Sequence, residues 1–435
     1  MLIFKNPLLY LLPTFISFIP VEILGVDGEF LQRIVISGNS IPYWDAFLFI
    51  GILGYVLVMP SRCPRQIRLV VGAMFLQAFL YLIFRSSAPP NQIIGMWLSF
   101  SSVGLVVLLS GHKKILSTVT LIHRFIPVLL GFFCLLVIGL GASLYWPALA
   151  SQELLVTIDR FDGGDFRLRW KTVRQTDEFV LALLSAWCAL QVFEKAKLIY
   201  LVPLVVLFSS QLLHSSRGGI LLVMICSLVT FLFFIKRTPG SSSMKGIIVS
   251  VLAFLTLFWI MIWGVNHPII ANFGEVAQDD TIRGRMKEAA MNLFYNNPVF
   301  GNGFFELHAT EEWRPFLLDH MLLPIHNVLL HYLVYMGIVG GLLFVALLVV
   351  LGVIQFRNLR QNAHLPEPLR WFQALSFAVY ISAVYMVIFQ SFDRLTLMLF
   401  WTIMGLSIAV NLSYPARSMG KMKKQTLPTY GQSKD

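Results

Sequence analysis

The chain of 435 residues is 57% hydrophobic and only 13% charged, with 36 phenylalanines and a mean hydropathy of +0.75. A typical soluble domain carries about 25% charged residues, so this composition excludes a water-soluble globule and predicts one all-α polytopic membrane domain over residues 1–435. The net charge of +11 is assigned to membrane topology and not to a nucleic-acid partner, because Lys and Arg accumulate in cytoplasmic loops. None of the four cysteines belongs to a CxxC motif, so neither a disulfide framework nor a zinc site is expected.

The spans follow from the length of the apolar runs, since a helix crosses the bilayer with about 20 apolar residues. We predict about twelve transmembrane helices, at residues 7–26, 45–60, 69–84, 93–110, 125–146, 179–193, 198–213, 219–235, 246–264, 328–354, 372–390 and 395–412. With the N-terminus inside, 20 of the 33 basic residues fall in cytoplasmic segments. The positive-inside rule therefore predicts that both termini are cytoplasmic.

Two longer segments, 147–178 and 265–327, then face outward, and the second is too long for a passive connection. Both are basic, with Arg160, Arg167, Arg169, Lys171 and Arg174 in the first and Arg283, Arg285, Lys287 and Arg314 in the second. An outer surface this basic indicates an anionic partner, although single residues can equally face anionic lipid headgroups. The predicted spans hold few ionisable groups, which argues against ion-coupled transport.

The second outer segment is expected to be partly helical. From residue 283 an apolar stripe repeats at helical spacing, formed by Met286, Ala289, Ala290, Leu293 and Phe294. Residues 279–281 are expected to cap the start of this helix, residues 296–298 to end it, and residues 301–303 to make a tight turn. Arg283 and Arg285 then occupy the first turn, where the helix dipole disfavours cations, so their placement suggests a role in binding a ligand.

Two more outer features stand next to predicted spans. Residues 215–219, Ser-Ser-Arg-Gly-Gly, form a hinge, and Arg217 at this depth needs an anion, carbonyl groups or the lipid phosphates. Residues 324–327, Pro-Ile-His-Asn, precede the tenth span, and His326 is a candidate general base, a hydrogen-bond donor or an interfacial residue. The other histidines nearby lack the spacing of a metal site.

Together these residues resemble the O-antigen ligase and O-antigen polymerase family. The resemblance rests on Ser216-Arg217-Gly218, Arg283, Pro298, Gly301-x-Gly303 and His326-Asn327. It is specific from about residue 215 to residue 341, while the N-terminal half matches in span number and topology. Lys287 departs from the pattern, because many relatives carry Trp at that position.

The resemblance implies a glycosyltransferase of the bacterial inner membrane that works at the periplasmic face without a metal or other cofactor. Its donor is a glycan on undecaprenyl diphosphate, and its acceptor is a hydroxyl of lipid A–core. Arg217 and Arg283 would stabilise the diphosphate, and His326 would accept the acceptor's proton. Weaker contacts to phosphate or core glycan are expected from Arg285, Arg167, Arg169, Lys171 and Arg174.

Three alternatives stay open. An O-antigen polymerase uses the same donor with a second lipid-linked repeat as acceptor; a ligase is favoured because lipid A–core is rich in phosphate and the outer surface is basic. A metal-dependent mechanism would use an acidic pair, Asp27 with Glu29 or Asp162 with Asp165. A lipid-linked glycan flippase is the rival of a different class, and it should line its central spans with charge.

Overall fold

The computed structural model describes residues 5–17, 33–36, 39–58, 63–145, 156–160, 166–170, 174–195, 197–213, 224, 226, 276–318, 321–322, 325, 327–361, 365–389 and 394–415. Within these ranges the chain is built from helices, with three two-stranded antiparallel ribbons beside them. The prediction of a helical protein is confirmed, and the ribbons are an addition that the hydropathy pattern did not predict.

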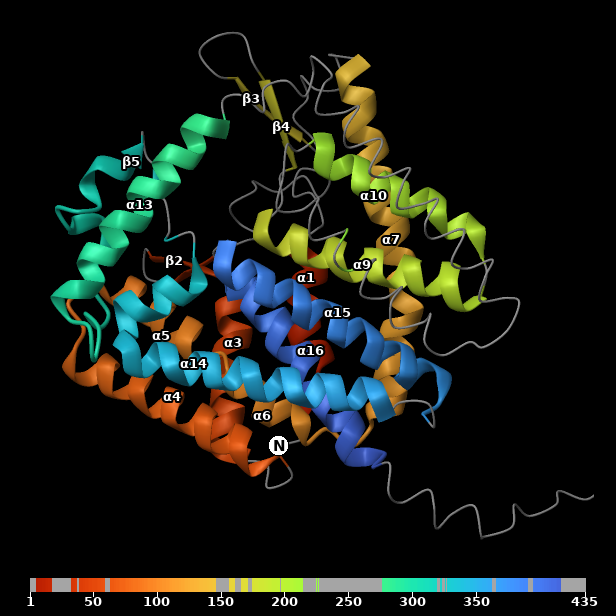
Figure 1. Ribbon diagram of the computed structural model, residues 1–435, viewed down its shortest axis with the longest axis horizontal. Helices are drawn as coiled ribbons and strands as arrows, with labels where there is room; N and C mark the ends of the chain where they lie inside the picture. The colour runs from red at the N-terminus through yellow and green to blue at the C-terminus, as the bar shows by residue number, and fades with distance from the viewer. Residues whose placement is uncertain are drawn as a thin grey trace, which may run out of the picture.

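The helices form an elongated bundle (Figure 1). Its α-helices are α1 (Leu8–Ser17), α3 (Tyr43–Val58), α4 (Arg65–Phe84), α5 (Pro90–Ser101), α6 (Gly104–Ser110), α7 (Ile115–Tyr145), α9 (Arg174–Lys195), α10 (Leu201–Leu213), α13 (Val276–Asn296), α14 (Val328–Gln361), α15 (Glu367–Phe389) and α16 (Arg394–Ser413). Single turns of 3-10 helix are η3 (Leu198–Tyr200), η5 (Leu307–Ala309) and η6 (Arg314–Phe316). The ribbons pair β1 (Arg33–Ile36) with β2 (Asn39–Pro42), β3 (Val156–Arg160) with β4 (Phe166–Trp170), and β5 (Leu317–Leu318) with β6 (Met321–Leu322).

Among the described residues, five helices are long and apolar enough to cross a bilayer. They are α4, α7, α14, α15 and α16. A sixth span results if α5 and α6, which are bent by 46° at their junction, cross as one; the sequence predicts one span there, at residues 93–110. Several predicted spans therefore coincide with described helices. The predicted spans 219–235 and 246–264 lie outside the described residues, apart from Met224 and Cys226.

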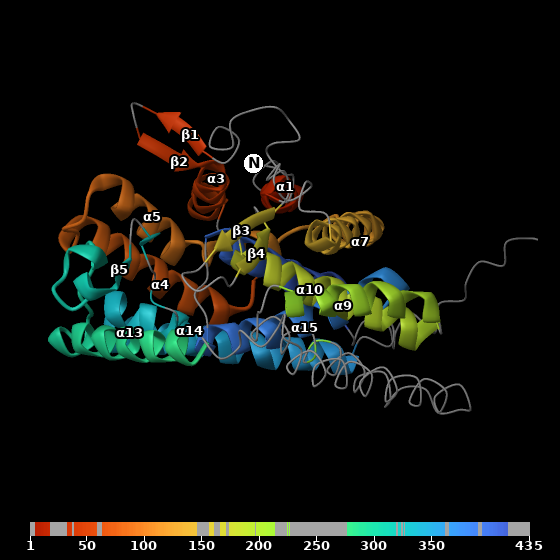
Figure 2. The ribbon, with the colours of Figure 1, turned by 90° about the horizontal axis from the view of Figure 1, so that it is seen from above.

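α16 is the central helix of the bundle. Every residue from Leu395 to Val410 is buried, and the helix contacts α1, α3, α6, α7, α9, α14 and α15. A helix that is apolar on all sides suits a position surrounded by other spans. In Figure 2, α1 and α3 lie on one side of the bundle and α13 and α14 on the other.

An ion pair joins the first turns of α3 and α16. Arg394 Nε lies 2.9 Å from Asp45 Oδ1, and Asp45 is 4% exposed. Gly95 of α5 leaves room for the guanidinium, because a Cβ there would overlap it. Charges at membrane depth are tolerated when they pair with each other, and this contact places the beginnings of α3 and α16 beside the middle of α5.

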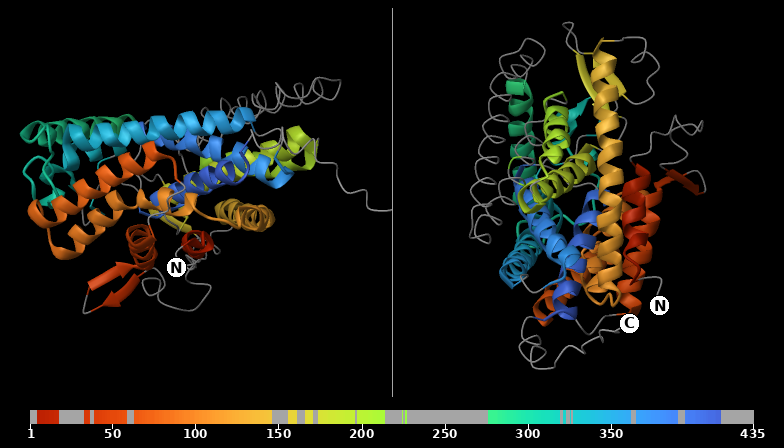
Figure 3. Two further views of the ribbon diagram at one scale, coloured as in Figure 1. Left: turned by 90° about the horizontal axis from the view of Figure 1, so that it is seen from below. Right: turned by 90° about the vertical axis from the view of Figure 1, so that its right-hand side faces the viewer.

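The elements that position the candidate site meet at one corner. α13 packs along α14, α14 packs on α4, and α4 is joined to α5 by a short turn. The long helix α7 lies on a different side of the bundle from α13 (Figure 3). The corner of α4, α5, α13 and α14 therefore brings a segment from the N-terminal half of the sequence against the predicted outer segment 265–327.

Candidate functional site

The apolar stripe predicted for the outer helix is confirmed. Met286, Ala289, Ala290, Leu293 and Phe294 are all buried, and α13 contacts α14. Arg285 and Lys287, between the stripe positions, are exposed. The spacing of the stripe therefore fixes which face of α13 packs against the protein and which face stays exposed.

The predicted start of this helix is wrong. α13 begins at Val276, so Asp279 and Asp280 lie within its first turns instead of capping it, and Arg283 is its eighth residue. Acidic side chains near the N-terminus are favoured by the helix dipole, which gives these two aspartates a place inside the helix. Because Arg283 and Arg285 are beyond the first turn, the dipole no longer supplies a reason to assign them to a ligand.

The end of α13 is as predicted. The helix ends at Asn296, and Gly301 and Gly303 have φ of 71° and 77°, the left-handed region that a tight turn uses and that glycine adopts without strain. The turn runs directly against α14, where Gly337 has φ 67° and ψ −169° and interrupts the helix. A Cβ on either Gly301 or Gly337 would overlap backbone atoms across this contact.

The interruption frees three carbonyls of α14 that a continuous helix would satisfy internally. Each accepts a hydrogen bond from outside α14. These bonds are Asn302 N to Val334 O at 2.9 Å, Gly303 N to Tyr335 O at 3.0 Å, and Gln77 Nε2 to Met336 O at 2.8 Å. An unsatisfied backbone group in a bilayer costs several kcal/mol, so the turn and Gln77 make the break tolerable.

Two amides beyond the break are satisfied in the same way. Ile338 N donates to Pro298 O at 2.8 Å, and Val339 N donates to Val299 O at 3.2 Å. The chain after α13 thus lies in the gap of α14 and replaces part of its hydrogen bonding. We call this contact, residues 293–303 with 334–339, the α13–α14 joint.

The end of α4 is hydrogen-bonded to the same turn. Arg85 Nη1 donates to Gly301 O at 2.8 Å, and Tyr81 Oη donates to Phe300 O. Phe304 N donates to Arg85 O at 2.7 Å, and Ser87 N donates to Phe304 O at 2.8 Å. A segment outside the region of sequence resemblance therefore forms one wall of the candidate site.

A carboxylate and a histidine lie just beyond this wall. Gln92 Nε2 of α5 donates to Glu306 Oε1 at 3.2 Å. Burial lowers the pKa of His308, and the nearby Glu306 carboxylate opposes that shift. The neutral imidazole is thus favoured at this position.

The first turn of α14 is held at a defined place. Asn327 Oδ1 accepts a hydrogen bond from Leu330 N at 2.7 Å, which is an N-cap, and Asn327 Nδ2 donates to Ile388 O of α15 at 2.8 Å. Ile325 on the other side of His326 is buried. The backbone that flanks the predicted base is therefore anchored on both sides.

His331 belongs to an aromatic layer beneath this turn. Its ring stacks on Phe100 of α5 with centroids 5.4 Å apart and lies 4.6 Å from the Tyr335 ring. Phe100 also stacks on Phe304 at 5.8 Å. These contacts explain His331 as a packing residue that joins α5, α14 and the turn after α13.

Only some of the predicted site residues belong to the part of the chain that the structure describes. Arg217, Lys171 and His326 lie outside the described residues, as do the acidic pair Asp27 with Glu29 and both Asp162 and Asp165. Arg167 and Arg169 are in β4, where their backbones lie opposite those of Asp159 and Thr157 in β3. Arg174 begins α9. Arg283 is in α13 and Arg285 is exposed on it.

Gln77, Tyr81, Arg85 and Asn302 also belong to this corner, and the sequence pattern does not predict them as site residues. Gln77 and Tyr81 fall inside the predicted span 69–84, and Arg85 follows that span directly. A polar residue in an apolar span was the available signal, since such residues mark contacts between helices. At the joint, the partners of Gln77, Tyr81 and Arg85 are more than 200 residues away in the sequence, so spacing alone does not identify these three residues.

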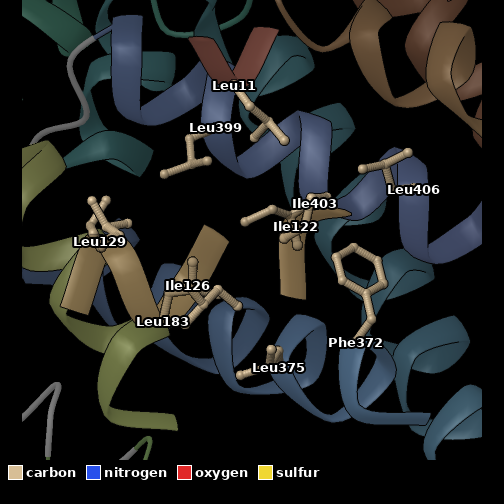
Figure 4. Close-up of a pocket in the computed structure, with 11 residues that line it drawn as sticks. Leu11, Ile122, Ile126, Leu129, Leu183, Phe372, Leu375, Leu399, Ile403 and Leu406 are labelled. Atoms are coloured by element: carbon tan, nitrogen blue, oxygen red, sulfur yellow. The ribbon is translucent and has the colours of Figure 1, made fainter. Parts of the chain in front are cut away.

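An apolar gap lies on the other side of the bundle, among α1, α7, α9, α15 and α16 (Figure 4). Leu11, Ile126, Leu183, Phe372 and Ile403 are among the side chains that line it. Its volume is about 50 Å³, well below the roughly 300–1,000 Å³ of ligand pockets. At this volume it is a packing gap between the helices, lined by apolar side chains.

Taken together, the apolar helices and the interrupted α14 define a multi-pass helical membrane protein with a built corner at the start of α14. Residues 202–345, about a third of the chain, match the family model of a domain described as O-Antigen ligase. This domain is shared by O-antigen ligases and polymerases, and it implies glycosyl transfer from lipid-linked glycans. No curated protein matches the chain. The matched range includes α13, the α13–α14 joint and the first half of α14.

Proposed function

We propose that the protein is an O-antigen ligase, which transfers a glycan from undecaprenyl diphosphate to a hydroxyl of lipid A–core at the periplasmic face of the bacterial inner membrane. The observation that carries this proposal is the family match over residues 202–345. The built corner supports it, because α13, which bears Arg283 and Arg285, packs on α14, whose first turn follows His326.

The reaction is a displacement at the anomeric carbon of the first sugar. The acceptor oxygen forms the new glycosidic bond, the bond from the sugar to the diphosphate oxygen breaks, and undecaprenyl diphosphate leaves with the electron pair. Arg217 and Arg283 stabilise the charge that develops on the leaving diphosphate. His326 accepts the acceptor's proton, since an imidazole has an unperturbed pKa near ~6.5 and is largely neutral at pH 7.

Arginine suits this role better than lysine. Its planar guanidinium donates two parallel hydrogen bonds to a phosphate, which a point charge cannot reproduce. Arg285 on the exposed face of α13 is proposed as a further phosphate contact. Arg167 and Arg169 of β4, together with Lys171 and Arg174, are proposed to contact the phosphate-rich acceptor.

The proposed topology has about twelve spans with both termini in the cytoplasm. The basic segment 147–178 and the large segment 265–327 then face the periplasm, where both substrates present their polar parts. Because arginines neutralise the diphosphate, no metal is proposed for the reaction.

O-antigen polymerase is the second candidate, because the matched domain is shared by both enzymes. The lipopolysaccharide ladder of a strain lacking this chain separates them. A ligase predicts loss of all bands above the core, and a polymerase predicts a single band of core plus one repeat. An unchanged ladder would contradict both.

A further inference from the structure

Asn302 connects three parts of the candidate site through one side chain. Its Nδ2 donates to Leu293 O in the last turns of α13 at 2.8 Å and to Val334 O of α14 at 3.1 Å. Its Oδ1 accepts from Asn297 Nδ2 at 2.8 Å. Asn302 N also donates to Val334 O, so backbone and side chain hold the same carbonyl.

The place of this carbonyl gives the contact its importance. Val334 lies in the last turn of the short helical segment that runs from residue 328 to the break at Gly337. The other end of this segment is tied to α15 through the bond from Asn327 Nδ2 to Ile388 O. A helical segment of about nine residues is marginal by itself, so its position depends on contacts at both ends, and Asn302 and Asn327 supply side-chain bonds to these.

We propose that Asn302 is a positioning residue for glycosyl transfer, which sets α13 at a fixed distance and angle from the first segment of α14. The inference rests on the proposed function, in which α13 carries a diphosphate-binding arginine and residue 326 precedes α14. A shift of about 1 Å between reacting groups can lower a rate about 100-fold. Asn302 touches neither substrate in this account, so it acts through the two helices.

The expected signature is a loss in turnover without a loss in donor affinity. Asn302→Ala removes both side-chain bonds from Nδ2, and we expect kcat to fall by about 10- to 100-fold while the KM for the lipid-linked donor stays close to its original value. Asn302→Asp keeps the acceptor for Asn297 but points a carboxylate at two carbonyl oxygens, so it should lower kcat at least as far. The matched control is Asn91→Ala, because Asn91 is exposed and its side chain accepts a bond from its neighbour Gln92 N.

Spin labels test the positioning without an enzyme assay. We choose labels at Lys287→Cys on α13, which is exposed, and at Leu329→Cys on the first segment of α14, which is half-buried. The background carries Cys134→Ser, because Cys134 is half-buried and Cys63, Cys188 and Cys226 are buried. Pulsed electron resonance should give one narrow distance distribution for the parent protein and for Asn91→Ala. In Asn302→Ala the distribution should broaden or shift.

The outcomes are distinct. Unchanged kcat and an unchanged distance distribution in Asn302→Ala would overturn the inference, and so would a lower thermal midpoint with normal turnover per folded protein. A broadened distance distribution together with a reduced kcat supports it.

If wild-type protein in liposomes transfers no glycan, the proposed function fails, while the distance measurement still decides whether Asn302 positions the helices. If Asn302→Ala does not yield folded protein, Asn297→Ala, which loses one exposed hydrogen bond, should show the same changes at smaller amplitude.

Discussion

Polar groups within the membrane-spanning helix α14 find hydrogen-bond partners in different ways near its two ends. At the α13–α14 joint the helix is interrupted at Gly337, and its freed backbone groups bond to a turn and to Gln77 of α4. Toward the other end the helix is continuous, and its polar side chains bond to the side chains of neighbouring spans.

The second arrangement centres on Ser407 of α16. Its hydroxyl donates to Gln355 Oε1 at 2.9 Å and lies 2.7 Å from Gln373 Oε1. Asn358 Nδ2 donates to Gln373 Oε1 at 3.3 Å, and Gln373 Nε2 donates to Ser407 O at 3.0 Å. We call Gln355, Asn358, Gln373 and Ser407 the amide cluster, and all four are buried.

We expect the contacts at one end of α14 to determine the stability of the bundle, and those at the other end to determine the positions of the site segments. The amide cluster joins α14, α15 and α16 through side chains, so the loss of one bond weakens the bundle without moving the site. The α13–α14 joint uses backbone groups of a turn, so a change there moves whole segments. We therefore expect the loss of a side-chain hydrogen bond at the joint to lower turnover, and the loss of one in the amide cluster to lower stability alone.

The largest expected effect is that of Gly337→Ala. Its φ and ψ fall in a region that is essentially restricted to glycine, at a cost of about 1–3 kcal/mol for other residues, and a Cβ would also overlap Val299 O. Folded protein should be lost or its thermal midpoint strongly lowered, as measured by size-exclusion yield and unfolding in detergent. Gly131→Ala in α7 is the control, because a Cβ there meets no atom within 4 Å. Normal yield of Gly337→Ala would refute the interruption of α14.

Ser407→Ala should have a moderate effect on stability alone. It leaves two amide oxygens with fewer partners in the amide cluster, and hydrogen bonds between membrane helices contribute about 0.6–2 kcal/mol. We expect the free energy of unfolding to fall by about 1 kcal/mol, with unchanged kcat per folded protein. Ser117→Ala, which removes an exposed bond to Lys114 O, should leave stability unchanged. A large fall in kcat for Ser407→Ala would contradict the proposal that the amide cluster affects stability alone.

A smaller effect is expected from pH near the joint. Burial places the folded pKa of His308 below its ordinary value, so the folded state favours the neutral imidazole more strongly than the unfolded state does. The contribution of His308 to the free energy of unfolding is therefore fully present above the unfolded pKa of about 6.5 and is lost as the pH falls below it. Thermal midpoints measured from pH 7.5 to 5.5 should fall less in His308→Gln than in wild type. Glu306→Gln removes the opposing charge and should make the fall steeper, and the reverse order would contradict this account.

No effect is expected from a chelator. Since arginines neutralise the leaving diphosphate in the proposed mechanism, purified protein should keep its turnover in EDTA. A loss of activity that magnesium or manganese restores would favour the acidic pairs Asp27 with Glu29 or Asp162 with Asp165.

The local features of this corner could be predicted from the sequence, and its long-range contacts could not. The stripe of α13 and the turn at Gly301 follow from spacing and from glycine chemistry. The start of α13 was misplaced because Asp279 and Asp280 suit both a cap and a first turn. The break at Gly337 lies within a continuous apolar run, where an isolated glycine is common. The partners that make the break possible, such as Gln77, come from a distant part of the chain, and only the folded structure brings them together.

Glycan transfer by reconstituted variants tests the central claim most directly. Proteoliposomes that contain the purified chain, the undecaprenyl-diphosphate-linked donor and lipid A–core should form product. His326→Ala should lower the rate by roughly 10²–10⁴-fold and leave donor binding intact, while Arg217→Ala and Arg283→Ala should abolish transfer and Lys at either position should rescue it poorly. His308→Ala and His320→Ala should retain activity. Near-normal transfer by His326→Ala would contradict the assignment of His326 as the base.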